Sequence, residues 1–263
     1  MTLFAFHGKR MAWALIPPVC GVVLAVLIWW AAGWVVSSNP ATANFAGFAP
    51  APAFSRLAAM LGHGDILRAI VPSLLRVAKG LALAIAVGVP LGMGIGHNAS
   101  LRAATHIPFQ FLRMISPLAW MPIAVLGFPS WEGAITFLIA MAAVWPITFS
   151  TAHGLRRVDP QWFKVARNLG AKRWLLLKGV MLPAIAQDIL TGIRLAVGVA
   201  WIVLVPAEYL GVTSGLGYAI NDARDTLEYD RLAALVLVIG VIGFSLDGLC
   251  LLLIRRFGWR LDA

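Results

Sequence analysis

Charged residues inside long apolar segments are the first candidates for chemistry in this sequence. Arg113, Arg194, Glu208 and Asp247 each interrupt a stretch that is otherwise uncharged. A charge at the middle of a membrane helix costs about 2.5–3.5 kcal/mol on insertion scales, so such a side chain needs a partner or a water-filled cavity. These positions therefore predict either ion pairs between helices or a pathway for a charged solute.

The segment around Arg113 is the best candidate for such a pathway. Its prolines leave backbone carbonyl groups without their usual N–H partners four residues on. Breaks of this kind are tolerated where other helices or a cavity satisfy the freed groups. For Arg113 itself, a pathway role and a structural ion pair stay equally open. The candidate pathway residues in this segment are Arg113, Ser116, Pro117 and Trp120.

Arg194 and Glu208 complete the candidate pathway. They are fourteen residues apart on one predicted helix, which is nearly four turns, so they face the same side but cannot touch. Asp188 and Asp247 are the possible partners for Arg194, and a packing ion pair competes with a pathway role. Asp247 is also a possible proton-relay carboxylate. Because its face carries no second intramembrane acid, we expect a local pair.

Arg76 and Lys79 lie near one end of an apolar segment. Their long side chains either extend to the lipid headgroups or attract an anion to an entrance, and the sequence leaves both interpretations open. Several intramembrane cations and few acids are compatible with an anionic cargo. This pattern does not select a particular anion.

Membrane helices are the elements that position these side chains. Hydrophobic residues make up 60% of the 263-residue chain and charged residues 12%, whereas an ordinary soluble domain has roughly a quarter charged residues. About 20 apolar residues are needed for a helix to cross a bilayer. We therefore predict an all-α integral membrane protein with a single transmembrane domain over residues 1–263. The six spans are expected at roughly 12–36, 74–97, 104–128, 133–152, 185–207 and 232–254.

Basic residues are shared unevenly between the two ends of these spans. Thirteen of the 21 Lys and Arg residues fall at the termini, between spans two and three, or in the loop 153–184, against four in the alternate loops. The positive-inside rule then places both termini and this loop in the cytoplasm. Residues 11–36 carry no charge and exceed the roughly 7–15 apolar residues of a secretory signal. We therefore expect a first helix that is retained.

Three glycines spaced four residues apart, Gly88, Gly92 and Gly96, stack on one face of the second span. Such a stripe lets a neighbouring helix backbone approach closely. We expect close helix packing here, with a role in the solute path as the alternative.

Missing motifs exclude several function classes. The sequence has no G-x-x-x-x-G-K-[ST], so it does not bind ATP through a P-loop, and any energy from ATP must come from a separate subunit. It has no H-E-x-x-H, and its five histidines are scattered, which gives no support to a membrane metalloprotease. We expect no catalytic residue, metal site, cofactor or nucleic-acid partner.

The basic loop is expected to form two short helices joined at a glycine. The first helix covers about 161–169, with Lys164 and Arg167 projecting away from its apolar side. Gly170 permits a sharp turn with positive φ, and a second helix follows over about 172–179. A basic loop that only fixes topology is the alternative. The second helix is expected to bury three apolar side chains, Trp174, Leu175 and Leu177.

The spacing of Ala166, Gly170, Leu182 and Pro183 matches the EAA loop of bacterial ABC-transporter permeases, E-A-A-x3-G-x9-I-x-L-P. With its flanks, including "RMISPLAWMPIAVLGF" and "LPAIAQDILTGIRLAVGVAWIVLVPAEYLG", nearly the whole chain resembles the permeases of nitrate, sulfonate, taurine and bicarbonate importers. Lys164 stands where the family usually has glutamate. If that glutamate pairs with a basic residue of the ATPase in the family, this chain uses another pairing or has a partner altered to suit.

The resemblance implies a type I ABC importer permease in the bacterial inner membrane, which transports a small anion and is not itself an enzyme. It implies a dimer of this chain, an ATP-binding subunit seated on the loop, and an external substrate-binding protein. Glu208 matches an acidic position of the family near the outer gate. An ion-coupled secondary carrier or channel is the alternative. The implied coupling residues are Lys164, Ala166, Arg167, Gly170, Ala171, Leu182 and Pro183.

Overall fold

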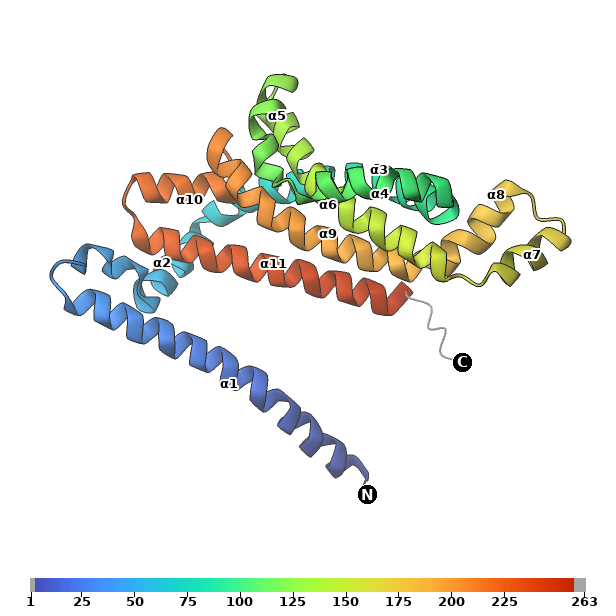
Figure 1. The fold of residues 1–263 in the computed structure, drawn as a ribbon. Coiled ribbons are helices and arrows are strands. Elements are labelled where there is room, and N and C mark those ends of the chain that lie inside the picture. The colour runs from blue at the N-terminus through green and yellow to red at the C-terminus, as the bar shows by residue number, and fades with distance from the viewer. Residues whose placement is uncertain (1–2, 258–263) are drawn as a thin grey trace. The chain divides into compact units, whose positions relative to one another are not determined.

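The computed structural model describes residues 3–257, with side chains from 16 to 256, and this part of the chain contains helices and no strand (Figure 1). Lys9, Arg10 and Arg260, which contribute to the uneven distribution of basic residues, lie outside the described side chains. The elements are α1 (Leu3–Ser38), η1 (Ala43–Phe48), α2 (Pro50–His63), α3 (Asp65–His97), α4 (Ala99–Met114), η2 (Pro117–Trp120), α5 (Met121–Gly127), α6 (Trp131–Arg157), α7 (Pro160–Asn168), α8 (Arg173–Leu176), η3 (Leu177–Met181), α9 (Leu182–Gly211), α10 (Leu216–Asp225) and α11 (Tyr229–Phe257).

Six segments correspond to the predicted spans. Five helical segments are long and apolar enough to cross a membrane, namely Ile16–Ser38, Asp65–His97, Trp131–Arg157, Arg173–Gly211 and Tyr229–Arg256. The sixth is a bent pair in which Ala99–Met114 and Pro117–Gly127 are inclined by 89°. The all-α membrane fold is thus confirmed, together with the break expected in the third span.

Local sequence signals set several helix ends. The Asn98 side chain accepts hydrogen bonds from the N–H groups of Ser100 and Leu101 and caps α4. Ser116 has ψ 130°, as expected for a residue before proline, where the ring disfavours the helical conformation. The break between α4 and η2 therefore follows from Pro117.

The chain divides into two compact units, which are described separately. The first comprises Met1–Ile66 and Ile220–Val238, and the second comprises Leu67–Ala219 and Ile239–Ala263. In the first unit, the Trp29 indole N–H donates to the Phe48 carbonyl oxygen at 2.9 Å. The Phe48 ring also lies 5.0 Å from that of Tyr229. A hydrogen bond therefore joins α1 to η1, and an aromatic contact joins η1 to the start of α11 in this unit.

The core of the second unit is built on α6. Its contact with α9 is extensive, and Figure 1 shows the two helices side by side. A Cβ added at Gly192 of α9 would lie 2.8 Å from the Ser150 Cβ, and one added at Gly154 of α6 would lie 2.5 Å from the Asp188 Cβ. These glycines allow the antiparallel backbones to approach closely.

The glycine stripe of α3 packs against the same helix. A Cβ at Gly88 would lie 3.1 Å from the Val144 carbonyl oxygen, and one at Gly92 would lie 2.5 Å from that of Thr148. Gly96 repeats the pattern one turn further along. The expected packing role of the stripe is confirmed, because α3 and α6 run parallel and in register along it.

Candidate functional site

The broken third span borders a cavity of about 410 Å³. Arg113, Pro117 and Trp120 line it from the two sides of the break, and α6 and α9 supply the facing wall, which includes Trp145 and Val199. Ser116 is exposed at the break itself. Three of the four candidate pathway residues from this segment therefore converge on one space.

Arg113 faces an aromatic ring. Its guanidinium carbon lies 5.3 Å from the centroid of the Phe149 ring, which is within the range of an attractive cation–π contact. None of the described carboxylates forms a salt bridge with Arg113. Arg113 therefore lines the cavity without a described carboxylate as its partner.

Arg194 pairs with Asp247 across α9 and α11. Arg194 Nε donates to one carboxylate oxygen at 2.7 Å and Nη2 donates to the other at 2.8 Å. This two-point geometry matches a guanidinium to a carboxylate. The local ion pair expected for Asp247 is confirmed. Of the two acids that the sequence offered as partners of Arg194, the structure shows Asp247.

Glu208 lies at the centre of a buried polar cluster. Its carboxylate accepts hydrogen bonds from Ser73 Oγ at 2.8 Å, from Arg76 Nη1 at 2.6 Å and from the Gly217 N–H at 2.9 Å. Its side chain has no exposed surface. The acid at this position thus holds α3, α9 and the start of α10 together.

Arg76 joins the same cluster. Its guanidinium is 1% exposed, pairs with Glu132 as well as Glu208, and donates to the Ser214 carbonyl oxygen at 2.7 Å. Both interpretations of Arg76 offered by the sequence, headgroup contact and an anion entrance, are therefore wrong, because its partners enclose it. Lys79, one turn on, is exposed.

Sequence reasoning missed the other members of this cluster. Ser73 precedes Arg76 by three residues and so shares its helix face. This spacing indicates that Ser73 and Arg76 contact the same neighbouring segment. Glu132 and Ser214 come from distant segments, and nothing in the sequence places them beside Arg76.

The basic loop has the predicted turn. Gly170 has φ +81°, the Ala171 N–H donates to the Ala166 carbonyl oxygen at 3.0 Å, and the Gly170 N–H donates to that of Arg167 at 2.9 Å. This pair of bonds is a Schellman motif, which ends a helix with a left-handed residue. The spacing of Ala166 and Gly170 is thus explained by the way that α7 ends.

The side chains around this turn face outward. Lys164 and Arg167 are exposed, as expected. Trp174 and Leu175 are 65% and 61% exposed, so their predicted burial was wrong, and Leu176 is the residue of α8 that is buried. The helix register turns one apolar side chain inward and leaves its neighbours on the surface.

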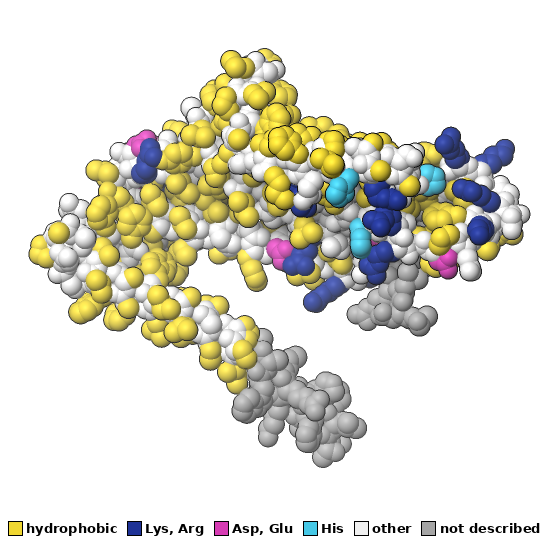
Figure 2. Space-filling view, viewed as in Figure 1, with side chains coloured by type: hydrophobic (Ala, Val, Ile, Leu, Met, Phe, Trp, Pro, Cys, Tyr) yellow, Lys and Arg dark blue, Asp and Glu magenta, His cyan; other side chains and the backbone are white. Residues whose placement is uncertain are grey.

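The remaining loop residues lead into α9. Leu182 and Pro183 form its first turn, directly after the π-helical turn η3. Pro183 and Ala166 both line a hollow of about 1550 Å³ between α7 and α9. Figure 2 shows Lys and Arg side chains gathered over α7 and α8. The loop therefore offers a basic surface beside a hollow that polar and apolar side chains line together.

Comparisons with known proteins agree with this architecture. Residues 85–259 match the family described as "Binding-protein-dependent transport system inner membrane component". The chain is 39% identical over 179 residues to the bicarbonate transport system permease protein CmpB of Synechococcus elongatus, a match that covers 67% of this chain and 64% of that protein. It is 30% identical over 270 residues to the taurine transport system permease protein TauC of Escherichia coli, covering 97% and 95%.

A solved structure shares the fold. An inward-facing structure of the MetNI methionine ABC transporter aligns with a TM-score of 0.61 and 14% identity, covering 73% of this chain and 95% of that one. At this identity the likeness concerns the fold alone. The family match and the two permease relatives go further: this chain belongs to the binding-protein-dependent ABC importer permeases, in the group that includes bicarbonate and taurine permeases.

Proposed function

We propose that this chain is the transmembrane subunit of an ATP-driven importer of a small anion. The Schellman turn at Gly170 is the main support for this proposal. It joins α7 and α8 into an exposed helical protrusion, called the docking knob below, on the most basic loop of the chain. Such a knob suits docking to a separate ATP-binding subunit, which the chain needs because it has no P-loop. The coupling residues are those of the loop, from Lys164 to Ala171, with Leu182 and Pro183.

The cargo is proposed from the relatives and from the cavity. The relatives are named for bicarbonate and taurine, of which the first is an anion and the second carries a sulfonate group. Arg113 contributes a positive charge to the cavity at the broken span, which favours an anion in a low-dielectric setting. Neither observation selects one anion of this class.

The assembly is proposed to be a homodimer with two ATP-binding subunits and an external substrate-binding protein. One chain supplies one docking knob, whereas an ATPase dimer presents two equivalent surfaces, which a twofold axis satisfies. The whole chain acts as one transmembrane unit in the inner membrane, with both termini and the basic loop in the cytoplasm.

A secondary carrier is less well supported. An ion-coupled carrier needs an intramembrane carboxylate that gains and loses a proton or cation. Two of the acids within the spans, Glu208 and Asp247, are each paired with an arginine, so neither of these two is poised for that exchange.

Reconstitution tests the proposal. The chain, a P-loop subunit and a substrate-binding protein from the same genome are placed in proteoliposomes, and uptake of labelled bicarbonate, nitrate and taurine is measured. Uptake that needs ATP and the binding protein is expected for at least one of these solutes. Uptake driven by an ion gradient without the ATP-binding subunit would instead establish the carrier.

A further inference from the structure

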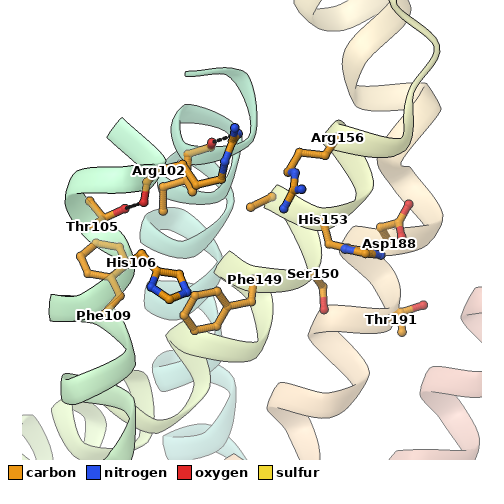
Figure 3. A pocket seen from close by; sticks show the side chains of 12 residues that line it. Arg102, Thr105, His106, Phe109, Phe149, Ser150, His153, Arg156, Asp188 and Thr191 are labelled. Atoms are coloured by element: carbon orange, nitrogen blue, oxygen red, sulfur yellow. Dashed lines mark hydrogen bonds between the residues drawn. The ribbon is translucent and has the colours of Figure 1, made fainter. Parts of the chain in front are cut away.

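A second cavity lies close to the one at the broken span. Its volume is about 520 Å³, and α4, α6 and α9 form most of its wall. Figure 3 shows Arg102 and His106 on α4 and His153 and Arg156 on α6 among the side chains that line this space. Asp188 is the one acid among the lining residues. We call this space the basic cavity.

The arginines of the basic cavity have uncommitted charge. Arg102 donates to the Ile95 carbonyl oxygen at 3.4 Å, and neither Arg102 nor Arg156 forms a salt bridge with any described carboxylate. The lining holds two guanidinium groups and one carboxylate, so its charged side chains are net positive. Because the volume far exceeds that of one small anion, the cavity suits an anion that keeps part of its water.

Aromatic side chains separate the two cavities. Trp145 lines the cavity at the broken span, whereas Phe109 and Phe149 line the basic cavity. The Phe109 and Trp145 rings meet edge to face at 5.4 Å between centroids, and Trp145 and Phe149 stack at 6.4 Å. The Arg113 guanidinium carbon lies 5.3 Å from the centroid of the Phe149 ring, and Arg113 lines the cavity at the broken span. The boundary is therefore an apolar layer with a cation on one face and the basic cavity on the other.

We propose that the basic cavity is the cytoplasmic exit vestibule for a hydrated anion, and that Phe109, Trp145 and Phe149 form the barrier before it. This inference rests on the proposed function, which supplies the anion and the orientation. Arg113 holds the anion above the barrier, and Arg102 and Arg156 attract it once the rings part. The vestibule thus favours release toward the cytoplasm.

Cysteine modification tests the charge of the vestibule without requiring transport. Ser150→Cys is introduced into the full chain together with Cys20→Ser and Cys250→Ser. Ser150 is chosen because it lines the basic cavity and does not line the hollow between α7 and α9. Inside-out vesicles are treated with a sulfonate-bearing or a trimethylammonium-bearing methanethiosulfonate reagent. We expect the anionic reagent to react faster, and nitrate or bicarbonate to slow it.

Charge-neutral variants provide the decisive comparison. Arg102→Gln or Arg156→Gln should each lower the anionic-to-cationic rate ratio by about three- to tenfold, because both arginines line the same cavity as Ser150 and charges interact strongly at low dielectric. Lys178→Gln removes the same charge from the same side of the membrane, outside the basic cavity, and should leave the ratio unchanged. If neither arginine substitution changed the anionic-to-cationic rate ratio, the proposal that the basic cavity is an anion vestibule would be rejected.

A second cysteine tests the barrier. Leu195→Cys, in the cavity at the broken span, should react slowly from the cytoplasmic side, and Phe149→Ala should speed it at least about tenfold by opening the boundary. If Leu195→Cys reacted at the same rate with and without Phe149→Ala, the claim that the aromatic side chains form a barrier would be rejected. Failed anion uptake in proteoliposomes alongside normal charge selectivity would instead count against the proposed function.

Discussion

Arg76 on α3 and Glu208 on α9 form an ion pair in which Nη1 and Oε1 are 2.6 Å apart and the two side chains are 1% and 0% exposed. The same guanidinium also pairs with Glu132, which is 51% exposed. One arginine therefore holds two carboxylates, and the buried one also accepts hydrogen bonds from Ser73 and the Gly217 N–H. Substituting each carboxylate in turn therefore compares a buried partner of Arg76 with an exposed one.

Removing the buried carboxylate should cost more than removing the exposed one. Glu208→Gln leaves the Arg76 charge without its buried partner, and loss of one member of a buried pair destabilises by about 3–5 kcal/mol. Glu132→Gln should cost about 0–1 kcal/mol, because water replaces an exposed partner. Denaturant titration of the purified chain in detergent compares the two variants. Equal losses would show that burial does not set the strength of this cluster.

Helix packing at the glycine stripe gives a second prediction. Gly92→Ala places a Cβ 2.5 Å from the Thr148 carbonyl oxygen, and such overpacking destabilises by about 1–3 kcal/mol. Gly240→Ala on α11 is the matched control, because its Cβ would meet no atom within 4 Å. The same titration should show a lower midpoint for the first variant alone. A Gly92→Ala chain as stable as the control would mean that α3 moves away from α6 without cost.

The fold was predictable because its signals are local. Apolar runs define the spans, Pro117 breaks the third of them, and the spacing of Ala166 and Gly170 records the end of α7. The sequence limits the partner of Arg194 to Asp188 or Asp247, because a charged side chain in the middle of a membrane needs a partner and few acids lie within the spans.

The Arg76 cluster was not predictable, because it depends on tertiary contacts. Arg76 lies 56 residues from Glu132 and 132 from Glu208, and a helix position alone does not show which distant segment covers it. Trp174 and Leu175 illustrate the converse, because apolar character alone did not indicate burial. The basic cavity was likewise missed, since its arginines and histidines come from separate helices.

The proposed orientation predicts where reporters will be found. A reporter fused after Arg157, at the start of the basic loop, should be cytoplasmic, because that loop concentrates Lys and Arg. One fused near Asp225, after the fifth span, should be external. Alkaline phosphatase and green fluorescent protein fusions report the two sides. The reverse pattern would reject the orientation and, with it, the docking role of the basic loop.

Gly170 provides the sharpest test of coupling, because its substitution changes the backbone and no packing contact. A Cβ at this position meets nothing within 4 Å, and the residue has φ +81°. Gly170→Val should therefore strain the turn by about 1–3 kcal/mol, whereas Gly170→Asn keeps a residue that tolerates the left-handed conformation. Both variants should insert in the membrane.

The two variants should differ in transport. Gly170→Val is expected to weaken co-purification of the ATP-binding subunit, or to leave ATP hydrolysis running without uptake, while Gly170→Asn stays close to the unaltered chain. Arg167→Glu should have a smaller effect than Gly170→Val, because exposed ion pairs contribute about 0–1 kcal/mol. Uptake and co-purification are measured together for all three. If Gly170→Val transports normally, the Schellman turn does not transmit ATPase closure, and the basic residues of the loop serve to fix topology.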